Sequence, residues 1–101
     1  MVTGGSQAVL IDSAGTLGVK DGSAIAPGIN FSANANTGIY RVGSNSIGFS
    51  VGGTQSLVID NAGGVQYKDG TNLAPAITFL NDTNTGIYRI GADTIGFATN
   101  G

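Results

Sequence analysis

Apolar and polar residues alternate over short runs of this chain with the two-residue period of a β-strand. Ile29 and Phe31 flank Asn30, and Ile47 and Phe49 flank a glycine. This spacing places both apolar side chains of a run on one face of the strand. No stretch has the apolar spacing of an amphipathic helix. The pattern predicts an all-β chain with strands over residues 7–12, 17–20, 28–32, 38–42, 46–51, 55–60, 65–68, 76–80, 86–90 and 94–99.

Residues that favour turns lie between these runs. Examples are Lys-Asp-Gly at 20–22 and 68–70 and the stretches rich in Asn, Asp and Thr that precede Gly38 and Gly86. We expect turns at all of them. The side chains of four aspartates are expected to accept hydrogen bonds from turn backbone. These residues are Asp12, Asp21, Asp60 and Asp69.

The chain contains a long internal repeat. A shift of 48 positions pairs residues 5–52 with 53–100 without a gap, and 23 of the 48 pairs are identical. We therefore divide the chain into residues 1–4, the tail of a preceding unit, residues 5–52, the first repeat, and residues 53–101, the second. This phase suggests a window cut from a longer array.

The composition argues against a self-sufficient core. The chain has 18 Gly, only 10% charged residues and 7% aromatic residues. Ordering about 100 residues costs on the order of 100–200 kcal/mol of conformational entropy, and Gly loses more backbone freedom than other residues. We expect three parallel copies to wind round one axis and bury their apolar stripes together. The expected core residues are Ile11, Ile29, Phe31, Ile47, Phe49, Ile59, Ile77, Phe79, Ile95 and Phe97.

Several function classes find no support. Without His, Cys or Glu, the remaining reactive groups recur at turn positions, so we expect no enzyme, no catalytic residue and no cofactor. A net charge of −2 with scattered basic residues predicts no nucleic-acid partner, and no apolar run is long enough for membrane insertion. The run from Asn81 to Gly86 lacks the closing carboxylate of a calcium loop, so we read it as a turn and predict no metal.

The Tyr-Arg pair of each repeat is the best candidate contact site. An aromatic ring and a planar cation can stack, or can bind a saccharide hydroxyl or carboxylate. A structural contact between chains is favoured over a receptor site, because a receptor site seldom needs a copy in every repeat. The residues are Tyr40, Arg41, Tyr88 and Arg89.

The second repeat also carries a recognisable motif, Thr-Gly-Ile-Tyr-Arg at 85–89 with Ile-Gly-Phe at 95–97. Together with the segment Leu-Val-Ile-Asp-Asn-Ala-Gly at 57–63, it resembles a repeat of tailed-bacteriophage tail fibre proteins. The resemblance covers nearly the whole chain. It implies a homotrimeric, intertwined β shaft that joins other fibre segments, lies in the virion outside the cell, and holds a distal tip toward host surface polysaccharide.

These observations predict an elongated, intertwined parallel homotrimer, of β-prism or triple β-spiral type, that serves as a rigid spacer in host attachment. Two alternatives remain open. One is a β module whose repeated loops bind bacterial surface polysaccharide directly. The other is a β-solenoid adhesin or filament subunit, in which the apolar stripe closes within one chain and copies stack end to end.

Overall fold

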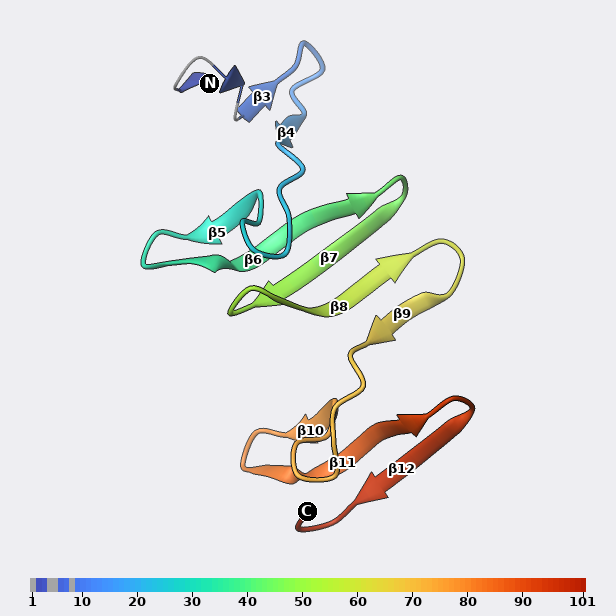
Figure 1. Cartoon of the computed structure of the whole chain (residues 1–101). Coiled ribbons are helices and arrows are strands. Elements are labelled where there is room, and N and C mark those ends of the chain that lie inside the picture. The colour runs from blue at the N-terminus through green and yellow to red at the C-terminus, as the bar shows by residue number, and fades with distance from the viewer. Residues whose placement is uncertain (1, 4–5, 8) are drawn as a thin grey trace. The chain divides into compact units, whose positions relative to one another are not determined.

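The computed structural model describes residues 2–3, 6–7 and 9–101, and side chains from residue 9 onward. The described residues form β-strands and no helix, so the predicted all-β class is confirmed (Figure 1). The strands are β1 (Val2–Thr3), β2 (Ser6–Gln7), β3 (Val9–Ile11), β4 (Leu17–Val19), β5 (Ile29–Phe31), β6 (Asn34–Gly43), β7 (Ser46–Val51), β8 (Thr54–Asp60), β9 (Gly64–Tyr67), β10 (Ile77–Phe79), β11 (Asp82–Gly91) and β12 (Thr94–Ala98).

The predicted strands correspond to β3 through β12, and the main error concerns two turns. Residues 34–37 and 82–85 were predicted as turns but form the first parts of β6 and β11. The chain reverses earlier, at residues 32–33 and 80–81, and a register irregularity follows in each hairpin. The polar residues after the reversal therefore extend the strand.

The chain forms two compact units, Met1–Gln66 and Tyr67–Gly101. The main sheet of the first unit has the order β5-β6-β7-β8-β9, with antiparallel neighbours from β5 to β8 (Figure 1). Two further sheets, β1-β2 and β3-β4, have two strands each. The second unit contains the antiparallel sheet β10-β11-β12.

The strands repeat with the period of the sequence. β5 and β10 begin at residues 29 and 77, β6 and β11 at 34 and 82, and β7 and β12 at 46 and 94, so the offset is the same for all three pairs. The boundary between the two compact units does not coincide with the boundary between the two sequence repeats. The reason is that β8, at the start of the second repeat, pairs with β7 at the end of the first. Strand pairing thus joins consecutive sequence repeats.

Each unit buries few large side chains. Among the described residues of the first unit, Tyr40 and Val58 are buried apolar residues, and Pro27 and Ser50 are buried in the same unit; Ala98 is buried in the second. Of the ten predicted core residues, only Phe49 is even partly buried, and the others are exposed. Within a single chain those ten residues form no core.

Candidate interaction surface

One face of the main sheet in the first unit is apolar across four strands. The register aligns Ile29 with Ile39, Ile39 with Phe49, and Phe49 with Leu57. The next row aligns Arg41 with Ile47 and Ile47 with Ile59. Because residues two apart share a face, both rows lie on the same side of the sheet. We call this side the apolar face; its apolar members are Ile29, Ile39, Ile47, Phe49, Leu57 and Ile59.

The second unit carries the same surface on three strands. Ile77 aligns with Ile87 and Ile87 with Phe97, while Arg89 aligns with Ile95. We include Ile77, Ile87, Ile95 and Phe97 in the apolar face of that unit. The predicted core residues include all members of the two apolar faces except Ile87 and, in the first unit, Ile39 and Leu57. Alternation with Arg41 and Arg89 along β6 and β11 is the signal that could have added the two isoleucines.

The opposite side of each sheet, which we call the tyrosine face, is where the buried residues gather. Tyr40 and Val58 both align with Gly48, from the two sides of β7. A Cβ at Gly48 would lie 2.7 Å from Tyr40 Cζ and 2.7 Å from Val42 Cγ2, so these side chains fill the space above the glycine. The hydroxyl of Tyr40 donates to Oε1 of Gln55. Burial raises the pKa of the Tyr40 phenol.

Tyr88 lies in the same way over Gly96 in the second unit. A Cβ at Gly96 would be 2.6 Å from Tyr88 Cζ. Tyr88 is only partly buried, however, and within residues 9–101 its hydroxyl has no hydrogen-bond partner. The difference from Tyr40 follows from the missing neighbour strand, because in the first unit β8 supplies both Val58 and Gln55.

Tyrosine and arginine of the predicted contact pair lie on opposite faces. Tyr40 and Arg41 are consecutive in β6, and consecutive strand residues point to opposite sides of a sheet. The same holds for Tyr88 and Arg89 in β11. The two side chains of a pair therefore cannot form one binding site within their own strand.

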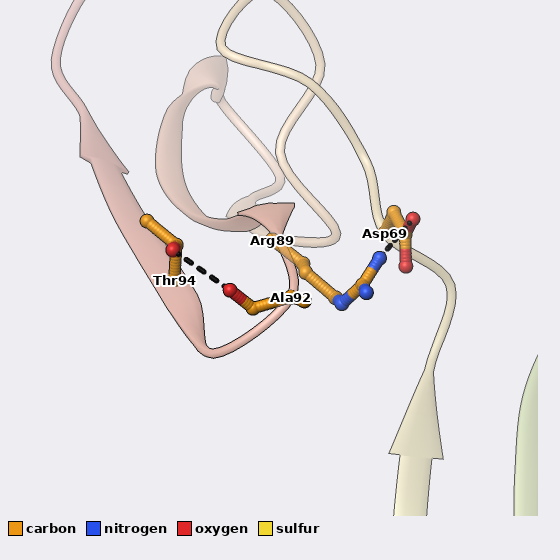
Figure 2. Close-up of polar contacts among 4 residues, drawn as sticks. All are labelled: Asp69, Arg89, Ala92 and Thr94. Atoms are coloured by element: carbon orange, nitrogen blue, oxygen red, sulfur yellow. Dashed lines mark hydrogen bonds and ion pairs between the residues drawn. The ribbon is translucent and has the colours of Figure 1, made fainter.

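Each of these arginines instead holds a loop of its own chain. Arg41 Nη1 lies 2.9 Å from Asp21 Oδ2, and the Arg41 amide donates to the Asp21 carbonyl at 2.8 Å. Figure 2 shows the equivalent ion pair of Arg89 and Asp69, also 2.9 Å long. All four side chains are about half exposed or more, so each pair is worth roughly 0–1 kcal/mol. The pairs therefore fix geometry more than stability.

This arrangement corrects one prediction and confirms another. The side chains of Asp21 and Asp69 were expected to bond to turn backbone, but they pair with arginines that lie far along the chain, in β6 and β11. Asp12 and Asp60 behave as expected: Asp12 Oδ1 accepts from Ala14 N, and Asp60 Oδ1 accepts from the amides of residues 62 and 63. Sequence alone did not separate the two classes, because long-range strand packing brings the arginines to Asp21 and Asp69.

A shallow groove runs beside the apolar face in each unit. In the first unit it has a volume of about 310 Å³ and lies between the loop at residues 19–21 and the side chains of Ile29, Ile39 and Ile47. In the second unit the equivalent groove, about 160 Å³, lies between residues 67–69 and Ile77, Ile87 and Ile95. The two grooves have matching walls, since Lys20, Asp21 and Arg41 recur as Lys68, Asp69 and Arg89.

Among the residues that the structure describes, no group of three or more His, Cys, Asp or Glu side chains lies close enough to hold a metal ion. The described part of the chain also contains no helix that could cross a membrane. No family model, curated protein or solved structure matches the chain.

Proposed function

We propose that this chain is a structural shaft segment of a phage tail fibre, in which three parallel copies turn their apolar faces toward a common axis. The segment acts as a rigid, extracellular spacer of the virion that joins other fibre segments and supports host attachment. The single observation that carries this proposal is the apolar face, which each unit presents on ordered strands. Monomeric soluble proteins rarely expose contiguous apolar patches beyond a few hundred Å².

The energy available from covering this face supports self-association. Ile29, Ile47 and Ile59 are 50%, 41% and 38% exposed in the single chain. Full burial of such a side chain contributes about 1.5–3 kcal/mol, so completing the burial of these three adds roughly 2–4 kcal/mol per chain. Three chains would gain about 6–12 kcal/mol, comparable with the estimated cost of lost translational and rotational freedom. The remaining apolar residues of both units add to this gain.

The position of the arginines agrees with a contact between chains. Arg41 is in register with Ile47 and Ile59 on the apolar face, and its guanidinium is already paired with Asp21. A charge held by its own aspartate can approach a neighbouring chain at lower cost than an unpaired one. Because Tyr40 is turned to the other face, direct polysaccharide binding by the Tyr-Arg pair has less support.

The test is the solution mass of the chain and of two matched variants by multi-angle light scattering. We expect the wild type at three times the chain mass of 10.0 kDa. Ile47→Asp, which would place three carboxylates at the proposed axis, should give monomers. Val42→Asp is the control, because Val42 is similarly exposed, at 44%, but lies on the tyrosine face.

A wild-type chain that stays monomeric at every concentration would contradict the shaft. So would a trimer that Ile47→Asp leaves intact, or one that Val42→Asp disrupts equally. Circular dichroism of each variant checks that its β structure is retained.

A further inference from the structure

The loop before β5 and the loop before β10 each contain an aspartate that is followed directly by a glycine. These dipeptides are Asp21-Gly22 and Asp69-Gly70, whereas none of the other four aspartates of the chain precedes a glycine. In an Asp-Gly sequence the aspartate side chain can react with the next backbone amide, because glycine has no Cβ to shield its nitrogen. Each loop therefore carries one chemically labile peptide unit.

Backbone packing requires the glycine in both loops. Gly22 has a φ of 68°, in the left-handed region that favours glycine. A Cβ on Gly22 would lie 2.7 Å from the Ala26 carbonyl oxygen and closer still to the Gly28 nitrogen. Gly70 also has a φ of 68°, and its Cβ would lie 3.0 Å from the Ala74 carbonyl oxygen. A residue with a side chain, which would shield the amide, is therefore strained at either position.

The fold also uses the aspartate that precedes each glycine. The Arg41 amide donates to the Asp21 carbonyl at 2.8 Å, and Arg41 Nη1 lies 2.9 Å from Asp21 Oδ2. Arg89 holds Asp69 in the same two ways, at 2.9 Å for each contact, and Figure 2 shows the ion pair. The labile dipeptide thus follows from two separate packing requirements, one for each of its residues.

We propose that Asp21 and Asp69 are the sites at which this chain isomerises spontaneously to isoaspartate, and that Arg41 and Arg89 slow the reaction by holding the two carboxylates. In the first step the Gly22 nitrogen attacks Cγ of the protonated Asp21 carboxyl. The bond between this nitrogen and Cγ forms, a Cγ–O bond breaks, and the hydroxyl leaves as water with the amide proton, which gives a cyclic succinimide. Water then adds to the former main-chain carbonyl carbon of Asp21 and breaks its bond to the Gly22 nitrogen. The product is isoaspartate, and no other reactant is needed.

The arginine acts as a positioning residue in this proposal. Attack requires the Asp21 side chain to turn about its Cα–Cβ bond toward the Gly22 nitrogen. In the structure the carboxylate is turned to Arg41 instead, so the ion pair has to open before the ring can form. The side chains of Arg41 and Asp21 are 51% and 61% exposed, so water reaches the site and the pair opens at modest cost. The arginine therefore slows the reaction without preventing it.

Isomerisation has a structural consequence, because it adds one methylene group to the main chain of the loop. The loop has no room for a longer backbone: a Cβ on Gly28 would already lie 3.3 Å from the Lys20 carbonyl carbon and closer still to its oxygen. The product therefore loses the close approach of residues 20 and 28. Both ion pairs lie within single units, Arg41 with Asp21 in the first and Arg89 with Asp69 in the second, so the proposal does not depend on the trimer.

The test compares the rates of isoaspartate formation at the two loops of one molecule, during prolonged incubation of the full chain below its unfolding transition. Liquid chromatography with mass spectrometry of the digested chain quantifies isoaspartate at each position. Arg41→Gln removes the guanidinium but keeps the backbone donor to the Asp21 carbonyl. We expect isoaspartate at residue 21 to form about two- to fivefold faster than in the wild type, the factor that the upper half of the range for an exposed ion pair corresponds to.

Asp69 in the same variant is the internal control, because its own arginine is unchanged and its rate should stay at the wild-type value. Any effect of the substitution on association would accelerate both loops. Ser23→Ala is the control for a looser loop, since it removes the hydrogen bond that Ser23 Oγ accepts from the Ala26 amide at 3.1 Å and leaves the ion pair in place. It should accelerate the reaction at residue 21 less than Arg41→Gln does.

Incubation in urea supplies the reference state in which neither ion pair forms. There the two loops should react at a common rate, and Arg41→Gln should match the wild type. An unchanged rate at residue 21 in folded Arg41→Gln, or equal acceleration by Ser23→Ala, would overturn the role of the arginine. An Arg41→Gln effect that persists in urea would overturn it as well, and an absence of isoaspartate at residues 21 and 69 in the unfolded chain would overturn the assignment of the sites.

Discussion

The close approach of β6 to β5 gives the sharpest test of the fold itself. Gly38 in β6 lies against the backbone of β5: a Cβ at this position would be 2.9 Å from the Ile29 carbonyl carbon and 3.0 Å from Asn30 Cα, and nearer still to the Ile29 carbonyl oxygen. Ordinary carbon contacts are about 3.5–4.0 Å. Gly38→Ala therefore forces β5 away from β6 by about half an ångström or more, and only backbone atoms are there to move.

The size of the effect follows from this geometry. Overpacking costs typically about 1–3 kcal/mol, and we expect about 3 kcal/mol because no flexible side chain can yield. For a domain of this size that loss lowers Tm by about 12–24 °C. Gly43→Ala, in the same strand, is the control: no heavy atom outside its immediate neighbours lies within 4 Å of its Cβ, so we expect a gain of about 0.5–1 kcal/mol.

The assay is urea unfolding followed by circular dichroism, with both variants at the same protein concentration because association changes apparent stability. The expected separation between Gly38→Ala and Gly43→Ala is roughly 3–4 kcal/mol. If the two variants instead differ by less than about 0.5 kcal/mol, the usual range for a surface substitution, the proposed packing of β5 on β6 is refuted.

Two further predictions use the same unfolding assay. The Asp60 carboxylate accepts backbone hydrogen bonds from Gly63 and Ala62, which lower its pKa. It therefore stabilises the fold above its unfolded pKa of about 3.9, and this contribution is lost as the pH falls through the lowered folded pKa. Asp60→Asn should destabilise the fold at pH 7, and its difference from the wild type should shrink as the pH is lowered; a difference that does not shrink would contradict this. Asn45 has a φ of 58°, so Asn45→Ala should cost about 1 kcal/mol while Asn45→Gly costs little, and equal losses would exclude backbone strain as the cause.

The sequence predicted the strands well because their signals are local. Alternation of Ile and Phe around a single small or polar residue identified β5, β7, β10 and β12 in the correct places. Residues 34–37 were misread because Asn and Thr favour turns when considered alone. In the fold, Thr37 Oγ1 accepts from the Gly52 amide at 3.0 Å, and the Asn36 carbonyl accepts from Gly53, so these residues hold the turn after β7.

The candidate surface was only half visible in the sequence. The two-residue alternation of apolar and polar residues predicted that Ile29, Ile47 and Ile59 share a face with their neighbours in the same strand. It could not predict how the strands align with one another, since register depends on turn lengths and bulges. Ile39 was missed because Arg41, rather than a second apolar residue, stands two positions after it. The pairing of arginine with a distant aspartate was likewise hidden, because it forms only when the loop at residue 21 is folded against β6.

The most repeated block of the sequence can now be explained residue by residue as a packing requirement. Thr37 accepts a hydrogen bond from the turn after β7, and Gly38 leaves room for the backbone of β5. Ile39 lies on the apolar face, and Tyr40 packs over Gly48 of β7. Arg41 forms an ion pair with Asp21 in the preceding loop. These five consecutive residues thus meet different neighbours, and each has its own structural role. Because each contact lies within one unit, the same five residues must recur in every unit that builds this sheet. The identity of the block between repeats is therefore explained by folding, which leaves the variable residues around it to carry any differences between one segment and the next.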